Sequence, residues 1–194
     1  MGIGFHIGWM PCVELNDGTV CFLLAALGPN YIRAHPLKSE LEYGTGNEMT
    51  IYFYTKNDTY GEFSNFSPHG VERDGLWWPT VEHYFQAQKF ADDVYRERIR
   101  TAHDAKQAAN LGRSRKVPLR ADWEEVKDEI MYQGVLRKFQ THAELKILLL
   151  STGDQEIVEN APGDYYWGCG KDGTGLNRLG EILVRVRGEL REVE

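Results

Sequence analysis

Residues 79–90, PTVEHYFQAQKF, combine a carboxylate, an amide and an amine at regular spacing. Glu82, Gln86 and Lys89 stand at i, i+4 and i+7, so a helix would align them along one stripe. Charged residues at such spacing most often form a solvent-exposed face. The alternative is a reaction site, in which the carboxylate is an acid or base and the amine is a nucleophile.

Large aromatic residues near this stripe favour a reaction site. They are Trp77, Trp78, Tyr84 and Phe85. A carboxylate and an amine packed against such apolar side chains would have perturbed proton affinities. The sequence therefore indicates Glu82 as an acid or base and Lys89 as a nucleophile, with a solvated helix face as the alternative.

Two irregular segments, residues 60–70 and 160–180, have the composition of ligand-binding loops. Both mix flexible backbone with aromatic, amide and acidic side chains, which can stack on and hydrogen-bond a planar polar ligand. In the second segment, Asp164, Trp167 and Asn177 supply a carboxylate, a stacking face and an amide. Its glycines would let backbone amides approach phosphate or sugar oxygens, although a tight turn without a ligand is the alternative.

The segment GRSRKVPLR, residues 112–120, concentrates positive charge in an otherwise acidic protein. It holds Arg113, Arg115, Lys116 and Arg120. Because Arg binds phosphate oxygens in a bidentate manner, this basic loop is the predicted phosphate holder. An exposed, solvated loop is the alternative.

Several common sites do not fit the sequence. GCGKDG, residues 168–173, matches G-x-G-x-x-G, but no apolar strand directly precedes it and a βαβ unit would need more chain. HAE, residues 142–144, lacks the P-C-x-x-C that completes a deaminase zinc site. Cys12, Cys21 and Cys169 fit neither a disulfide framework nor a cysteine zinc site. We therefore expect no metal, no cofactor and a reducing, cytoplasmic location.

The composition of the 194 residues, with 42% hydrophobic and 26% charged, is typical of a soluble globular protein. The net charge of -7 argues against a protein that coats nucleic acid, because such binding depends on clustered Lys and Arg. No run reaches the roughly 18 apolar residues of a membrane span, and no basic segment precedes VCFLLAALG. We expect neither a membrane anchor nor a signal peptide.

The residue patterns predict a single α+β domain that is predominantly helical, with a few short strands. A strand is expected at residues 50–55 and a hairpin at 71–78, where Asp74-Gly75 suits a two-residue turn with positive φ. Residues 1–48 lack a sustained period and are predicted to be an N-terminal extension, with an added strand or a partner-binding arm as the alternative. Residues 49–194 are the predicted domain.

Capping signals and apolar periodicity place the helices. They are expected at residues 79–90 with Thr80 as N-cap, at 92–102, at 104–111 with Gly112 as the stop, and at 179–190. Two capping-box spacings, Asp122 with Glu125 and Thr141 with Glu144, predict two more helices.

Five segments together resemble the NADAR family: YGEFSNF, WPTVEHYFQAQKF, LGRSRKVPLRADWEEVKDEIM, KFQTHAELKILLLST and DYYWGCGKDGTGLNRLG. They cover nearly all of residues 50–190, whereas residues 1–48 lie outside the resemblance. The resemblance implies a NADAR-like fold and N-glycosidase chemistry, the hydrolysis of the bond between the anomeric carbon of ribose and a nitrogen. It implies two substrate classes: a ribosylamino-pyrimidine phosphate of the riboflavin pathway, and ADP-ribose attached to guanine.

The resemblance also places roles on individual residues. Glu82, Lys89 and Asp164 are the expected catalytic residues, and Trp123 and Trp167 are expected to stack on the base. N-glycoside cleavage independently needs a carboxylate that steadies the sugar cation and an acid that protonates the leaving nitrogen. The other expected substrate contacts are Asn65, Phe66, Gln86, Arg113, Arg115, Arg120, Gly168 and Asn177.

A nucleotide or ADP-ribose binding module without turnover is the alternative function, because the same aromatic and basic groups would serve it. The expected partner is a small phosphorylated ribosyl compound, or ADP-ribosylated guanine in a nucleotide or nucleic acid. The sequence does not choose between these substrates and indicates no oligomeric state.

Overall fold

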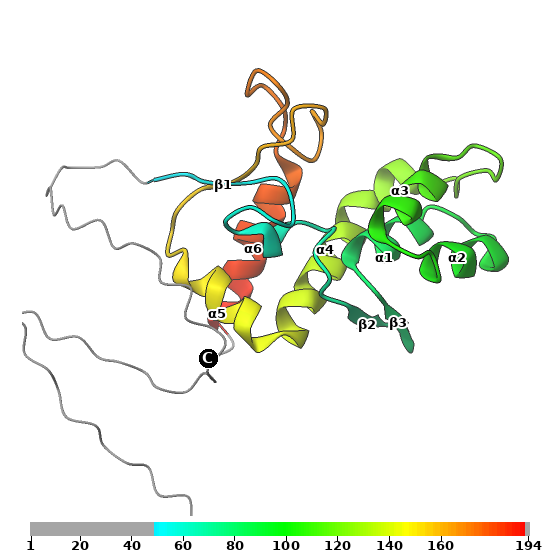
Figure 1. The fold of residues 1–194 in the computed structure, drawn as a ribbon, viewed down its shortest axis with the longest axis horizontal. Helices are drawn as coiled ribbons and strands as arrows, with labels where there is room; N and C mark the ends of the chain where they lie inside the picture. Colours follow the sequence, from blue (N-terminus) through cyan, green and yellow to red (C-terminus); the bar gives the residue numbers. More distant parts are fainter. Residues whose placement is uncertain (1–48, 193–194) are drawn as a thin grey trace, which may run out of the picture. The chain divides into compact units, whose positions relative to one another are not determined.

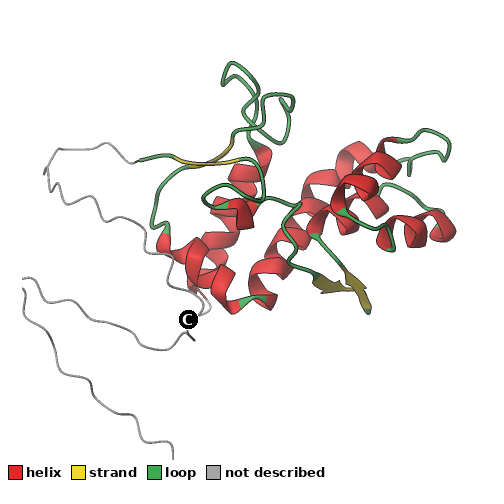
Figure 2. Ribbon diagram, in the orientation of Figure 1, coloured by secondary structure: helices red, strands yellow, loops and turns green. Residues whose placement is uncertain are grey.

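The computed structural model describes residues 49–192 as six α-helices, four short strands and one 3-10 helix (Figures 1 and 2). The helices are α1 (Val81–Ala87), α2 (Asp93–Arg100), α3 (Ala105–Arg113), α4 (Trp123–Thr141), α5 (Ala143–Ser151) and α6 (Arg178–Glu192). The strands are β1 (Ile51–Phe53), β2 (Val71–Arg73), β3 (Leu76–Trp78) and β4 (Ile157–Glu159), and the 3-10 helix η1 spans Gly61–Phe63. The predicted α+β class, mainly helical, is confirmed. The predicted extension, residues 1–48, lies outside the described residues, so that division of the chain stays a prediction.

Three helices begin where the sequence predicts. Thr80, Asp92 and Asp104 precede α1, α2 and α3, and each side chain accepts a hydrogen bond from the backbone N–H three residues later, at 3.3, 2.8 and 2.7 Å. Such caps satisfy N–H groups that have no partner within the helix. The cap at Thr80 is the most important of the three for the candidate site, because it sets where α1 begins and so which way Glu82 and Gln86 point.

The predicted hairpin is also confirmed. β2 pairs with β3 in antiparallel register, with Val71 opposite Trp78. Asp74 and Gly75 have φ of 55° and 74°, as a two-residue turn of this kind requires.

Both helices predicted from capping boxes are present, as α4 and α5, but neither capping box forms. The carboxylate of Asp122 does not cap α4, because it accepts two hydrogen bonds from the guanidinium of Arg120, at 2.6 and 2.8 Å. Thr141 is the last residue of α4, and its hydroxyl donates to the carbonyl of Arg137 at 2.7 Å. The helix α5 begins after His142 instead.

The predicted stop at Gly112 is wrong as well. Gly112 is buried within α3, which continues to Arg113 and ends at Ser114. Its lack of a side chain makes room for Gln86 of α1, because an added Cβ would lie 1.8 Å from Gln86 Oε1. The glycine therefore allows close packing between α1 and α3.

A parallel pair of strands, β1 and β4, joins distant parts of the chain. Ile51 lies opposite Ile157 and Phe53 opposite Glu159. Side chains two residues apart on a strand point to the same face, so Glu159 shares the face on which Ile51, Phe53 and Ile157 are buried. The sequence analysis did not predict β4, and this inward-pointing carboxyl was missed with it.

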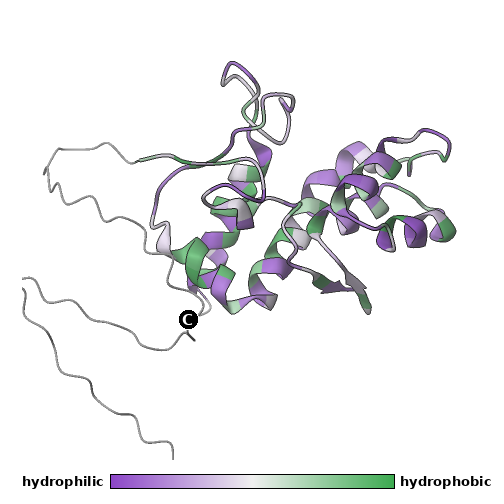
Figure 3. Ribbon diagram, in the orientation of Figure 1, coloured by the Kyte–Doolittle hydropathy of each residue, from purple (hydrophilic) through white to green (hydrophobic). Residues whose placement is uncertain are grey.

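The central helix is α4, which contacts α1, α5, α6 and β2. It buries Met131, Val135 and Phe139, and Figure 3 shows hydrophobic and hydrophilic residues alternating along α6, which packs against it. Lys138 of α4 is buried too, and its side-chain nitrogen donates to the carbonyls of Glu62 and Ser64, which ties η1 to the core.

The helices described between residues 49 and 192 include none with the length and apolar composition of a membrane-spanning segment.

Candidate active site

Glu82 lies in the first turn of α1 and is buried, with 6% of its surface exposed. Its backbone N–H donates to the carbonyl of Asn65 at 3.1 Å, and its carboxylate accepts a hydrogen bond of 2.8 Å from Gln86 Nε2. Gln86 is buried to the same extent. The stripe that the sequence predicts therefore faces the interior and is not a solvated surface.

Burial raises the pKa of Glu82 to about 7, because the carboxylate loses hydration. The hydrogen bond from Gln86 and the positive charges of Lys89 and Arg113 oppose this rise in pKa, whereas the negative charge of Asp164 adds to it. A carboxyl group with a pKa near neutrality can either accept or donate a proton under physiological conditions.

Lys89 follows α1 and is half-buried against aromatic rings. Its Nζ lies 5.3 Å from the ring centroid of Phe85 and 5.6 Å from that of Trp123. Burial lowers the pKa of this amine; the charge of Glu82 opposes the shift, and the charges of Arg115 and Arg113 reinforce it. A lowered pKa increases the fraction of neutral amine, which is the nucleophilic form.

The aromatic residues expected to stack on a base lie together. Phe85 is the centre of the group, with ring centroids 5.1 Å from Trp123 and 5.3 Å from Trp167. Trp123 comes from the first turn of α4 and Trp167 from the glycine-rich loop, residues 160–177. Together with Lys89 they form one wall of the candidate site.

Asp164 shapes the glycine-rich loop. Its Oδ1 accepts hydrogen bonds from the backbone N–H groups of Tyr166 and Trp167, at 2.9 and 2.8 Å, which fixes the position of the Trp167 ring. Its charge also acts on Glu82 and Glu159, whose pKa values it raises.

Asn177 and Gly168 connect the same loop to β4. Asn177 Oδ1 accepts from the backbone N–H of Glu159 at 2.9 Å, and its Nδ2 donates to the carbonyl of Ile157 at 2.9 Å. An added Cβ on Gly168 would lie 2.8 Å from the carbonyl oxygen of Glu159. The structure thus gives both residues a role in holding Glu159, and their contact with substrate stays a prediction.

The loop after η1 presents two more of the predicted contacts. Asn65 is buried; its Nδ2 lies 3.2 Å from the sulfur of Met131, and its Oδ1 has no partner among the residues that the structure describes. Phe66, by contrast, is 40% exposed. Their binding roles stay predictions.

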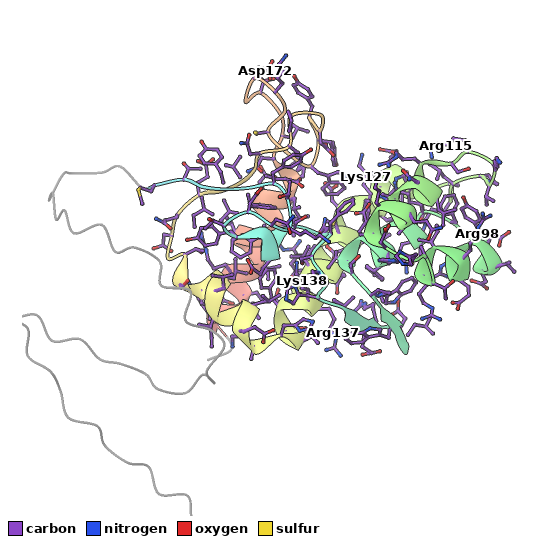
Figure 4. All side chains as sticks on the ribbon, in the orientation of Figure 1. Arg98, Arg115, Lys127, Arg137, Lys138 and Asp172 are labelled. Carbon is purple, nitrogen blue, oxygen red and sulfur yellow. The ribbon has the colours of Figure 1, made fainter. Side chains whose placement is uncertain are left out.

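The arginines of the basic loop, residues 112–120, differ in their exposure and in their partners. Arg113 and Arg115 are exposed, and Figure 4 shows Arg115 in the segment that follows α3, whereas Asp172 lies at the tip of the glycine-rich loop. The positive charges of both help to lower the pKa of Lys89. Arg120 is different, because its guanidinium is occupied by Asp122 while its backbone N–H donates to the carbonyl of Lys89 at 2.8 Å.

We expect Gly112→Ala to disturb Glu82 through Gln86. The new methyl group would displace the Gln86 side chain and break its hydrogen bond to Glu82, which now lowers the pKa of that carboxyl. The pKa of Glu82 should therefore rise above its value of about 7, and the acidic limb of the pH–activity profile should move to higher pH.

A matched control is Gly188→Ala in α6, where an added Cβ meets nothing within 4 Å. Alanine stabilises helix interiors by up to about 1 kcal/mol relative to glycine, so this variant should unfold at an equal or higher temperature with an unchanged profile. Identical pH profiles for the two variants would show that Gly112 does not act on Glu82.

Among residues 49–192, no group of three or more His, Cys, Asp or Glu side chains is placed to hold a metal ion.

Comparison with known proteins identifies the family. The family model of the NADAR domain matches residues 52–191. "N-glycosidase YbiA" of Shigella flexneri serotype 5b is 45% identical over 155 residues, 80% of this chain and 97% of that protein. "N-glycosidase Npun_R5314" of Nostoc punctiforme is 50% identical over 148 residues, 75% of this chain and 95% of that protein.

Two further matches concern a longer protein and a solved structure. "Riboflavin biosynthesis protein PYRR, chloroplastic" of Zea mays is 42% identical over 156 residues, 72% of this chain but 25% of that protein. The NMR structure of the Escherichia coli protein YbiA superposes with a TM-score of 0.71 at 47% identity, and the match covers 76% of this chain and 88% of that one.

Proposed function

The chain belongs to the NADAR domain family, and we propose that this N-glycosidase hydrolyses the bond between ribose C1 and the nitrogen of a heterocycle in a phosphorylated ribosyl compound. The observation that carries the proposal is the burial of Glu82 beside Lys89 and the Phe85, Trp123 and Trp167 wall. A module that only binds nucleotides has no need of a buried carboxyl whose pKa is about 7.

Bond cleavage builds positive charge at C1 and on the ring oxygen of ribose, and it leaves an electron pair on the departing nitrogen. Glu82 as carboxylate stabilises that cation and takes the proton of the attacking nucleophile. The nucleophile is water or the neutral amine of Lys89. Gln86 keeps the carboxylate of Glu82 in position through its 2.8 Å hydrogen bond.

The heterocycle is expected to lie against the indole rings of Trp123 and Trp167, whose faces accept any planar base. Among phosphorylated ribosyl compounds, a ribosylamino-pyrimidine phosphate is the substrate we propose. The support is the similarity to a longer relative whose name assigns it to riboflavin biosynthesis. ADP-ribose attached to guanine is the second candidate substrate, because it also joins a phosphorylated ribose to a planar base.

The direct test is to incubate the full chain with a ribosylamino-pyrimidine phosphate and, separately, with ADP-ribosylated guanosine. Mass spectrometry should detect free pyrimidine in the first incubation. Release of guanosine and ADP-ribose alone, from the second compound, would replace the proposed substrate with the second class. Binding without cleavage of either compound would make the protein a binding module.

We expect Arg113 and Arg115 to bind the substrate phosphate. Replacing either by Gln should raise KM for the phosphorylated substrate roughly 10- to 100-fold, since a hydrogen bond to a charged group contributes about 1.5–3 kcal/mol. KM for the dephosphorylated substrate should change little. Comparing the two substrates in steady-state assays isolates the phosphate contact.

Arg120→Gln is the matched control, because the guanidinium of Arg120 is already paired with Asp122. Its effect should be smaller and equal for both substrates. A larger phosphate-specific effect in Arg120→Gln than in the other two variants would move the phosphate site to the far end of the basic loop.

A further inference from the structure

Glu159 is a third carboxyl at the candidate site, and nothing in the sequence motifs pointed to it. It is the last residue of β4, and strand alternation turns its side chain towards the face where Ile157, Ile51 and Phe53 are buried. No hydrogen bond or ion pair to its carboxyl is found among the residues that the structure describes. A carboxyl in an apolar setting without a cation partner favours its protonated form.

The backbone of Glu159 is held from several directions. Its N–H donates to Asn177 Oδ1, and its carbonyl accepts from the N–H groups of Ala161 and Cys169, each at 2.9 Å. Asn160 next to it donates to the carbonyl of Phe53 at 2.8 Å. A side chain on so constrained a backbone has a defined position relative to the rest of the site.

Hydrogen bonds to Cys169 and Asn177 place the backbone of Glu159 against the glycine-rich loop that carries Asp164 and Trp167. Burial is the main cause that raises the pKa of Glu159 to about 8, followed by the charges of Asp164 and then Glu82. Asp164 acts on Glu82 as well. Gln86, Lys89 and Arg113 favour the carboxylate form of Glu82. We therefore expect Glu82 to be the negatively charged carboxyl and Glu159 to be the protonated one.

The reaction needs such a division of roles. Asp164, an expected catalytic residue, accepts two backbone hydrogen bonds through Oδ1, and its part in the reaction stays a prediction. Gln86 donates a hydrogen bond to the Glu82 carboxylate, whereas no donor to the Glu159 carboxyl is found among residues 49–192. Such different environments of two carboxyl groups suit a base and an acid. We propose that Glu159 is the catalytic acid that protonates the leaving nitrogen in the N-glycosidase reaction, an inference that rests on the proposed function.

The proton balance is complete with one water. The C1–N bond breaks, its electron pair stays on nitrogen, and the proton of Glu159 goes to that nitrogen. Water supplies hydroxide to C1, directly or after a Lys89 intermediate, and its remaining proton goes to Glu82. Transfer of this proton through solvent restores the acid at Glu159.

The test is the pH dependence of kcat/KM for wild-type protein and Glu159→Gln. For wild-type protein we expect activity to rise as Glu82 loses its proton and to fall again near pH 8, where Glu159 loses its own. Glu159→Gln should fold, because the amide resembles a protonated carboxyl in shape. It should lose about a hundredfold in kcat and lose the alkaline limb, whereas Glu159→Asp should retain that limb.

A second measurement separates an acid from a structural residue. A ribosyl-pyridinium phosphate leaves as neutral pyridine and needs no proton, so its hydrolysis by Glu159→Gln should fall by less than about fivefold relative to wild type. Equal losses on both substrates would overturn the assignment. Glu156→Gln, an exposed residue just before the same strand, is the matched control and should behave as wild type.

Failure of the inference is distinguishable from failure of the proposed function. If wild-type protein releases base and Glu159→Gln keeps the alkaline limb, the acid lies elsewhere and the inference alone is overturned. If wild-type protein releases no base from any N-riboside, the proposed function fails and the inference falls with it.

Discussion

Replacing Glu82 by Gln should lower kcat about a hundredfold or more, the usual scale for losing acid–base assistance, while the fold is kept. The amide preserves the shape of the side chain but removes the charge that would stabilise the sugar cation and accept a proton. Because Gln86 donates to Glu82 through its own amide, the side-chain carbonyl of the substituted residue can still accept that hydrogen bond. Steady-state kinetics with a ribosylamino-pyrimidine phosphate measures the effect.

The raised pKa of Glu82 also predicts how Glu82→Gln changes the stability of the folded protein at different pH values. In the folded protein the pKa of Glu82 is raised from 4.5 to about 7, so its contribution to stability is present below pH 4.5 and is lost as pH rises through 7. Glu82→Gln has no such loss and should unfold at a higher temperature than wild type at pH 8 and above. Thermal unfolding at pH 5 and pH 9 measures the difference.

Glu125→Gln is the control for both measurements, since Glu125 is exposed on α4. It should keep wild-type kcat and the wild-type pH dependence of unfolding. Near-normal turnover in Glu82→Gln would mean that the buried carboxyl is structural, and the proposed mechanism would be wrong.

Replacing Lys89 by Met should lower kcat about a thousandfold on the route in which its amine attacks C1 and forms an imine with ribose. The amine lies against two aromatic rings, and its pKa is lowered by burial. Methionine fills similar space and keeps the contacts with Phe85 and Trp123, so the fold should be preserved. Borohydride added during turnover should reduce the imine and fix the sugar to Lys89, where peptide mass spectrometry finds it.

Lys127 is the internal control for this trapping experiment. It lies over the Tyr166 ring at 3.8 Å but pairs with Glu124 at 2.5 Å, and its pKa is raised, so its amine should remain charged and unmodified. An active Lys89→Met variant without any borohydride adduct in wild type would favour direct attack by water. An adduct on both lysines would indicate non-specific reaction.

Local chemistry explains which parts of the fold could be predicted. Thr80 and the Asp74-Gly75 pair act within a few residues, through a side-chain cap and a backbone conformation, and both predictions are confirmed. The box at Asp122 is wrong because Arg120, two residues away, competes for the same carboxylate. Short-range patterns do not say which of two nearby partners a carboxylate takes.

Long-range packing explains what was missed. The strand β4 is three residues long and is defined by its pairing with β1, more than a hundred positions earlier, so no local pattern marks Glu159 as inward-pointing. Gly112 resembled a helix stop, but its role depends on Gln86 of a different helix. Sequence periodicity did place Glu82 and Gln86 on one buried face of α1. The predicted helix was too long, because α1 ends at Ala87 and the half-buried Lys89 follows it.

The most direct test of N-glycosidase activity through Glu82 is to measure product release from one substrate in water labelled with heavy oxygen. Purified wild-type protein and Glu82→Gln are each incubated with a ribosylamino-pyrimidine phosphate, and free pyrimidine and ribose phosphate are quantified by mass spectrometry. We predict that wild type releases both products in equal amounts, with the label in the ribose phosphate, and that Glu82→Gln releases about a hundredth as much or less. Intact substrate after incubation with wild type, or equal release by both proteins, would contradict the claim that this chain is an N-glycosidase acting through Glu82.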